Sequence, residues 1–265
     1  MNATEHFKAG RLREAVDAQV SEVKAKPSDS ERRVFLFELL LFTGELERAR
    51  KQIDAIQYDE VERQTALLGY RSLLDSEEAR RKVFRGEAAP EFFEEPFDSV
   101  RNRVEAVVAL AKGDIETARK LLEDANEDAA PISAVANGKS VVELRDADDL
   151  FGTVLEVMAK GKYYWVPLES VAAMAFNPPK YPRDTVYFPA KLQLLDGSTG
   201  DVYLPVMYPG SHEHPDDLVK LGRSTEWRDH GGLGPILGCG QKTLLAGEDA
   251  LGLLELRDLQ VTAGE

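Results

Sequence analysis

The sequence lacks the features that mark secreted and membrane-spanning proteins. It has one cysteine, Cys239, which excludes an internal disulfide and suits a reducing cytosol. No apolar run approaches the roughly 18 residues needed to span a membrane. The first residues include no basic segment followed by an apolar one, so we expect no secretory signal. These absences predict a cytoplasmic protein that does not insert into a membrane.

Positive charge is also scarce. The chain has 33 Lys and Arg residues against 47 Asp and Glu residues, which gives a net charge of −14. Such a chain repels nucleic acid phosphates, so we expect no nucleic acid partner. With 265 residues, of which 43% are hydrophobic and 30% charged, the chain has a globular composition and room for one large domain or two ordinary ones.

A short Gly–Ala pattern occurs three times, beginning at Gly10, Gly44 and Gly113. Each copy has an aliphatic residue two positions after the glycine and an alanine five positions after it. The first two glycines are 34 positions apart, which is the length of a tetratricopeptide repeat. A glycine that ends one helix and an alanine at a close helix contact are typical of stacked helix pairs. The pattern predicts a tetratricopeptide-like α-α superhelix over residues 1–130.

The second half of the chain has a different pattern, with more proline and glycine and short β-rich runs. Turn residues at Lys160-Gly161, at 196–200 and at 247–250 predict three hairpins, the last of which joins residues 242–246 to residues 253–261. Residues 168–176 are interpreted as one short helix. We therefore predict an α+β multidomain fold: the helical domain 1–130, a linker 131–140, and an antiparallel β domain 141–265 that forms a partly closed barrel.

One glycine-rich segment, residues 231–243, is similar to a phosphate-binding loop. That motif needs a glycine directly before Lys-Ser/Thr, but Gln241 separates Gly240 from Lys242 here. Pro235 also removes one backbone amide donor. We interpret this segment as a turn.

Potential metal ligands are present, but in patterns that argue against a metal site. His212 and His214 lie among prolines and a glycine, so a loop is expected rather than a strand that would point both rings to one face. The acidic residues 146, 148 and 149 lack calcium-loop spacing and are typical of a turn or helix cap. No Cys-His-Asn arrangement can be assembled around Cys239. We expect no catalytic residues, no cofactor and no metal.

A series of motifs after residue 140 resembles the ImpE family, also called TagJ or SciE-type, which belongs to type VI secretion gene clusters. The motifs occupy residues 145–150, 154–157, 164–167, 189–192, 204–211, 221–223 and 238–241. The Gly–Ala repeats are similar to the N-terminal part of that family. The resemblance implies a cytoplasmic accessory protein without known enzymatic activity.

The resemblance also implies partners. Members of the family are reported to bind the small sheath subunit TssB through its N-terminal helix, and thereby to be linked to the sheath and to the ATPase ClpV. We expect a non-enzymatic adaptor that acts in sheath assembly or ClpV-dependent recycling. Two alternatives stay open. One is an enzyme or small-ligand-binding protein with a site in the β domain, and the other is a nucleic-acid or chaperone-type scaffold.

The repeats suggest where a partner helix would bind. In a tetratricopeptide-like array the first helix of each pair lines the concave face, and this face is a groove suited to an amphipathic helix. The predicted docking residues are Glu31, Val34, Glu38, Leu41, Arg103 and Val107. The alternatives are that Val34 and Leu41 are core residues and that the partner binds an edge of the β domain.

Overall fold

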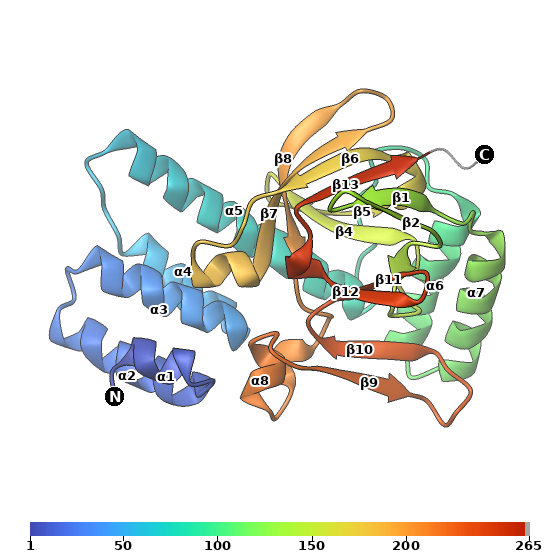
Figure 1. Cartoon of the computed structure of the whole chain (residues 1–265). Coiled ribbons are helices and arrows are strands. Elements are labelled where there is room, and N and C mark those ends of the chain that lie inside the picture. Colours follow the sequence, from blue (N-terminus) through green and yellow to red (C-terminus); the bar gives the residue numbers. More distant parts are fainter. Residues whose placement is uncertain (263–265) are drawn as a thin grey trace.

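A computed structural model describes residues 1–262 and shows helices followed by an antiparallel β part (Figure 1). The helices of the first half are α1 (Ala3–Lys8), α2 (Leu12–Ala25), α3 (Ser30–Phe42), α4 (Leu46–Asp54), α5 (Val61–Phe84), α6 (Asp98–Ala111) and α7 (Ile115–Asp128). The predicted order of a helical half and a β half is confirmed.

The three Gly–Ala copies each join a pair of packed helices: α1 with α2, α3 with α4, and α6 with α7. Gly10, Gly44 and Gly113 have φ angles of 76°, 70° and 77°, a left-handed conformation that a side chain would penalise. The alanines of the three copies are fully buried: Ala15, Ala49 and Ala118. The repeat pattern therefore identified real helix pairs.

The three pairs do not stack into one continuous array. The 24-residue helix α5 separates the second pair from the third, and Figure 1 shows α6 and α7 at the opposite end of the molecule from α1–α4. The β part interrupts the stack of helix pairs, because α5 contacts strands β4 (Val154–Ala159) and β5 (Lys162–Pro167). A single tetratricopeptide-like superhelix over residues 1–130 is not confirmed.

The main β element is an eight-stranded antiparallel sheet in the order β2-β1-β13-β6-β7-β8-β4-β5. Its remaining strands are β1 (Ser133–Ala136), β2 (Lys139–Val141), β6 (Val171–Phe176), β7 (Tyr187–Leu194), β8 (Thr199–Pro205) and β13 (Asp258–Thr262). A second sheet combines β3 (Arg145–Asp146), β11 (Thr243–Ala246) and β12 (Asp249–Gly252). A separate hairpin consists of β9 (Thr225–Asp229) and β10 (Ile236–Gly240).

The predicted partly closed barrel is wrong, because the eight-stranded sheet stays open between its outer strands β2 and β5. The α5–α6 connection covers the outer edge of β5 instead. The N–H of Glu91 donates to the carbonyl of Tyr163 (2.9 Å), and the N–H of Trp165 donates to the carbonyl of Glu91 (3.1 Å). A strand edge that is already bonded in this way cannot pair with β2 to close the sheet.

The predicted short helix at residues 168–176 is also wrong. Only Leu168–Ser170 forms a 3-10 turn, η1, and Val171–Phe176 is strand β6. Pairing with β13 on one side and β7 on the other outweighs local helix propensity. The hairpins predicted around 160–161 and 196–200 are confirmed, as β4–β5 and β7–β8. The third predicted hairpin is wrong in its second strand, because β11 pairs with β12, whereas β13 pairs with β1 and β6. The segment predicted as a linker contains β1, and a domain boundary near residue 130 stays a prediction.

Side chains from the β part also hold the first helices. Asp217, in the short helix α8 (Asp217–Lys220), accepts hydrogen bonds from the N–H groups of Leu12 (2.8 Å) and Arg13 (3.2 Å) at the start of α2. The guanidinium of Arg223 donates to the carbonyl of Phe7 (3.0 Å) and lies over its ring. The helix N-terminus thus receives its cap from the other half of the chain.

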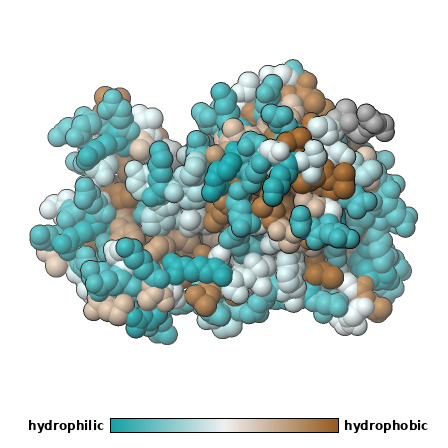
Figure 2. All heavy atoms as spheres, in the orientation of Figure 1, coloured by the Kyte–Doolittle hydropathy of each residue, from teal (hydrophilic) through white to brown (hydrophobic). Residues whose placement is uncertain are grey.

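Hydrophilic residues cover most of the face shown in Figure 2. Within residues 1–262, no helix is both long enough and apolar enough to cross a membrane.

Two repeat glycines offer a matched test of this packing. A Cβ on Gly44 would lie 2.1 Å from a carbon of the His212 ring, whereas a Cβ on Gly113 meets no atom within 4 Å. Both substitutions to alanine carry a left-handed backbone penalty of about 1–2 kcal/mol. Gly44→Ala should cost a further ~1–3 kcal/mol, as overpacked sites do. Thermal unfolding of both variants checks this, and equal melting temperatures would contradict the contact between Gly44 and His212.

Candidate functional site

Four buried charged side chains join helix α5 to the β part. The guanidinium of Arg80 on α5 binds Glu156 on β4 through two hydrogen bonds, Nε to Oε1 at 2.6 Å and Nη2 to Oε2 at 3.1 Å. The Nζ of Lys242 lies 3.1 Å from Glu156 Oε2 and 3.2 Å from Asp146 Oδ2. All four residues are buried, and their formal charges sum to zero. We call Arg80, Glu156, Lys242 and Asp146 the buried ionic network.

Aromatic side chains complete the hydrogen bonds of this network. The hydroxyl of Tyr163 donates to Glu156 Oε1, Trp165 Nε1 donates to the Tyr163 oxygen, and the hydroxyl of Tyr208 donates to Asp146 Oδ1, each at 2.6 Å. Burial raises the pKa of both tyrosines, so both hydroxyls keep their protons. The network is satisfied from within the chain, as expected of a structural joint.

Electrostatics within the network favours the charged forms. Burial alone would raise the pKa of Glu156, but the charges of Arg80 and Lys242 outweigh burial and lower it. The neighbouring Asp148 differs, because burial and then the charge of Asp146 raise its pKa to about 7. Asp148 accepts hydrogen bonds from the N–H groups of Leu150 (2.8 Å) and Gly238 (2.7 Å).

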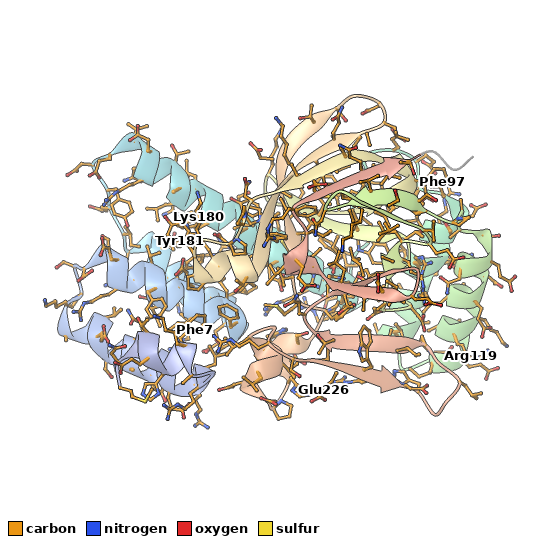
Figure 3. All side chains as sticks on the ribbon, viewed as in Figure 1. Phe7, Phe97, Arg119, Lys180, Tyr181 and Glu226 are labelled. Carbon is orange, nitrogen blue, oxygen red and sulfur yellow. The ribbon has the colours of Figure 1, made fainter. Side chains whose placement is uncertain are left out.

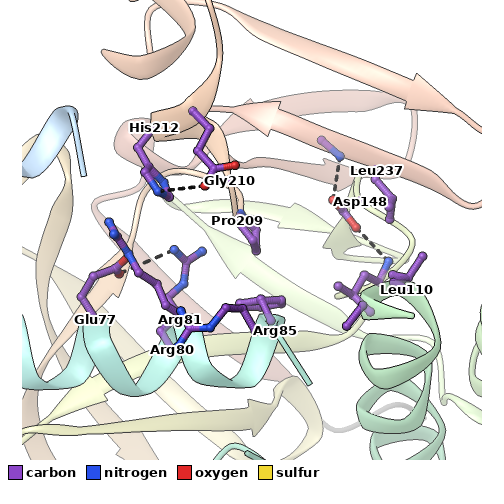
Figure 4. A pocket seen from close by; sticks show the side chains of 15 residues that line it. Glu77, Arg80, Arg81, Arg85, Leu110, Asp148, Pro209, Gly210, His212 and Leu237 are labelled. Carbon is purple, nitrogen blue, oxygen red and sulfur yellow. Dashed lines mark hydrogen bonds and ion pairs between the residues drawn. The ribbon is translucent and has the colours of Figure 1, made fainter. Parts of the chain in front are cut away.

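A cavity of about 410 Å³ lies beside the network, between α5, the end of α6, residues 209–213 and β10 (Figure 4). Phe84 and Leu237 line it with apolar surface, and Arg81 and Arg85 with positive charge. The volume is in the range of small-molecule sites. None of the described residues that line it is Ser, Thr, Cys or Lys, so no side-chain nucleophile of these types faces it.

Most polar groups of this cavity are engaged within the chain, although Glu77 Oε2 is buried and has no hydrogen-bond partner among residues 1–262. Arg81 Nε donates to Glu77 Oε1 (3.0 Å), and its Nη1 donates to the carbonyl of Gly44 (2.8 Å). Arg85 forms two hydrogen bonds with Glu87. Burial and then the charge of Arg81 lower the pKa of His212 to about 4, so this ring is uncharged at neutral pH. The arrangement allows a small molecule to bind. Asp148, whose pKa is raised to about 7, also lines the cavity, but its carboxyl group is held by the N–H groups of Leu150 and Gly238.

Of the docking residues predicted on α3, two are buried. Glu38 forms an ion pair with Arg183 of the 3-10 turn η2 (Pro182–Thr185), and the Arg183 guanidinium lies between the rings of Tyr70 (4.8 Å) and Tyr181 (4.0 Å). Figure 3 shows Tyr181 beside these helices. The β6–β7 connection thus covers Glu38. Leu41 is buried in the core.

The other docking residues lie at opposite ends of the molecule. Arg103 on α6 is 1% exposed, and its guanidinium donates to the carbonyl of Asp149 (2.7 Å). A Cβ on Gly152 would lie 2.3 Å from Arg103, so only glycine fits beside it. Val107 is also buried, whereas Glu31 is exposed and Val34 half-buried. The structure therefore does not bring α6 and α3 into one groove, and partner binding at these residues stays a prediction.

The segments weighed as metal or phosphate sites have structural roles. Asp149 Oδ2 accepts the N–H of Ile236 (2.7 Å), as Asp148 accepts that of Gly238, so these carboxylates hold β10 in place. Residues 231–234 form the turn that leads into β10. In the part of the chain that the structure describes, no three His, Cys, Asp or Glu side chains are grouped to hold a metal ion.

Sequence reasoning missed the buried ionic network, although one signal was available. Glu156 is the single charged residue in the otherwise apolar run of residues 154–159. A carboxylate within a fully buried strand needs a buried cation, and Lys242 and Arg80 supply the charge.

Three comparisons with known proteins give consistent matches, one to the second half of the chain and two to almost all of it. The family model described as ImpE protein matches residues 138–260. A protein of Pseudomonas aeruginosa named type VI secretion system accessory component TagJ is 33% identical over 259 residues, which cover 98% of this chain and 90% of that protein. A crystal structure of protein VPA1032 from Vibrio parahaemolyticus superposes with a TM-score of 0.89 at 25% identity, and covers 99% of this chain and 98% of that one.

The buried ionic network should contribute strongly to the free energy of unfolding. Glu156→Gln leaves Arg80 and Lys242 with an uncompensated positive charge, so we expect a loss of about 3–5 kcal/mol in the free energy of unfolding. The control is Glu95→Gln, which removes an exposed ion pair with Arg101 and should change little. Chemical denaturation measures both, and similar effects would contradict the structural role of the network.

Glu38 should make stability depend on pH. Burial raises its pKa from the usual 4.5 to about 7, although Arg183 opposes the shift. Between these values the folded state binds more protons than the unfolded state, so the contribution of Glu38 to stability falls as pH rises. Glu38→Gln removes this titration, and the stability of wild type relative to the variant should fall by ~2–3 kcal/mol between about pH 5 and pH 8. Parallel pH profiles in denaturation experiments would contradict this pKa.

Proposed function

Because this chain belongs to the ImpE family, we propose that it is a non-enzymatic accessory protein of a type VI secretion system. The observation that carries this proposal is the similarity, along almost the whole chain, to the TagJ accessory component. The cytoplasm is the proposed compartment. The closed hydrogen bonding of the buried ionic network supports a structural rather than a catalytic role for its charged residues.

We further propose that its partner is the N-terminal helix of the small sheath subunit TssB. Through that subunit the protein would be linked to sheath assembly or to recycling by the ClpV ATPase. The helix pairs α1–α2 and α3–α4 support this proposal, because tetratricopeptide-like pairs present grooves that accept amphipathic helices. The proposed contact includes Glu31 and Val34, the two predicted docking residues that remain accessible on α3.

A second candidate function is the binding of a small ligand in the cavity beside the buried ionic network. Its volume of about 410 Å³ and its mixed lining of Phe84, Leu237 and arginines favour this reading. A small molecule that mass spectrometry recovers from the purified, denatured protein would support it.

Calorimetric titration of a peptide with the sequence of the TssB N-terminal helix tests the proposed function. Wild type should bind, and the double variant Glu31→Lys, Val34→Gln should bind on the order of tenfold more weakly, since it loses one charged and one apolar contact.

The matched control replaces the exposed Val61 and Leu68 of α5 with glutamine. These residues lie seven positions apart on one face of α5, and Figure 1 shows this end of α5 projecting from the molecule. Loss of binding only in this control would move the contact from α3 to α5. Absence of binding to wild type would contradict the TssB proposal.

A further inference from the structure

Strand β9 forms an open edge of the β9–β10 hairpin. In the part of the chain described, its backbone pairs only with β10, and no other backbone hydrogen bond involves Glu226, Trp227 or Arg228. Figure 1 shows β9 as the outermost strand on its side of the molecule. In an antiparallel pair, alternate residues turn their N–H and C=O groups away from the partner. This edge therefore presents unpaired donors and acceptors to another strand.

The residues of β9 are complementary to a second copy of the same strand. The sequence is Thr225-Glu-Trp-Arg-Asp229. An antiparallel pair with a two-fold axis at Trp227 places Glu226 opposite Arg228 of the other copy, twice by symmetry, and Trp227 opposite itself. Both charged positions would meet the opposite charge, whereas any one-residue shift in register loses this match.

The side chains on this edge are available for such pairing. Arg228 is exposed, and within residues 1–262 its side chain has no ion-pair or hydrogen-bond partner. Glu226 is also exposed and lies 3.2 Å from the ring of His214. Trp227 is 42% exposed, and its inner edge packs against Tyr208 at a centroid distance of 5.7 Å. A half-exposed tryptophan at the centre of a strand edge is typical of the centre of a binding surface.

We propose that two copies of this chain associate through antiparallel pairing of their β9 strands, centred on Trp227. The two hairpins then form one four-stranded sheet with a two-fold axis. The outer strands of the two other sheets fit this role less well. Glu91 already covers β5, and β2 and β12 each carry a single charge, Lys139 and Asp249. The charge pattern of β9 favours a second copy, because antiparallel self-pairing compensates both of its central charges, Glu226 and Arg228.

The test is sedimentation velocity of the full chain over a wide range of protein concentration. Wild type should form a dimer that dissociates on dilution. Glu226→Arg and Arg228→Glu should each raise the dimer dissociation constant on the order of tenfold, because each turns two attractive pairs into like-charge pairs. The double variant, which carries both changes, exchanges the charges and should restore dimerisation to the wild-type level.

The control is Lys139→Glu on β2, which alters the charge of another sheet edge and should leave the dimer unchanged. Melting temperatures of all variants exclude misfolding as the cause of dissociation. A wild type that stays monomeric at every concentration would overturn the proposal. So would a dimer that neither single variant weakens, or a weakened dimer that the double variant does not restore.

Discussion

The structure depends on the bonds between Arg80, Glu156, Lys242 and Asp146. Taking these charges out of water costs several kcal/mol for each ion, and only close pairing with well-directed hydrogen bonds offsets that cost. The pairing is therefore demanding in geometry. It fixes helix α5 on strand β4, and α5 in turn determines where the flanking helix pairs lie.

This constraint explains why the helical half is not a free-standing array. In repeat proteins each helix pair contacts its neighbours, and the stack continues from pair to pair. Here α5 occupies the place of the next pair, and its second half lies against the sheet. The β6–β7 connection then covers part of the side of α3 that a partner would occupy in an ordinary array. Arg183 pairs there with Glu38, while Glu31 and Val34 stay accessible.

Much of the local structure was predictable, because it depends on short patterns. Gly44 and Ala49 identified a helix pair, and the turn residues at 160–161 identified a hairpin. The contacts of Glu38 and Arg103 were not predictable in this way. The hydrophobic period of a helix indicates which of its faces is apolar but not which residues cover that face. Glu38 and Arg103 are both covered by residues more than 40 positions away in the sequence. The sheet stays open because Glu91 covers the edge of β5. This contact was not predictable either, because Glu91 lies outside every strand that the sequence predicts.

The cap that Asp217 provides for helix α2 has a consequence for protein synthesis. The two ends of that hydrogen bond are 205 positions apart in the chain. Chains leave the ribosome N-terminus first, at roughly 5–20 residues per second. Helix α2 therefore waits on the order of ten seconds or more for the carboxylate that caps its N-terminus. During this interval the nascent helices expose the surfaces that the β part later covers. Once it is synthesised, the last third of the chain shields these helices, as a chaperone shields its client protein.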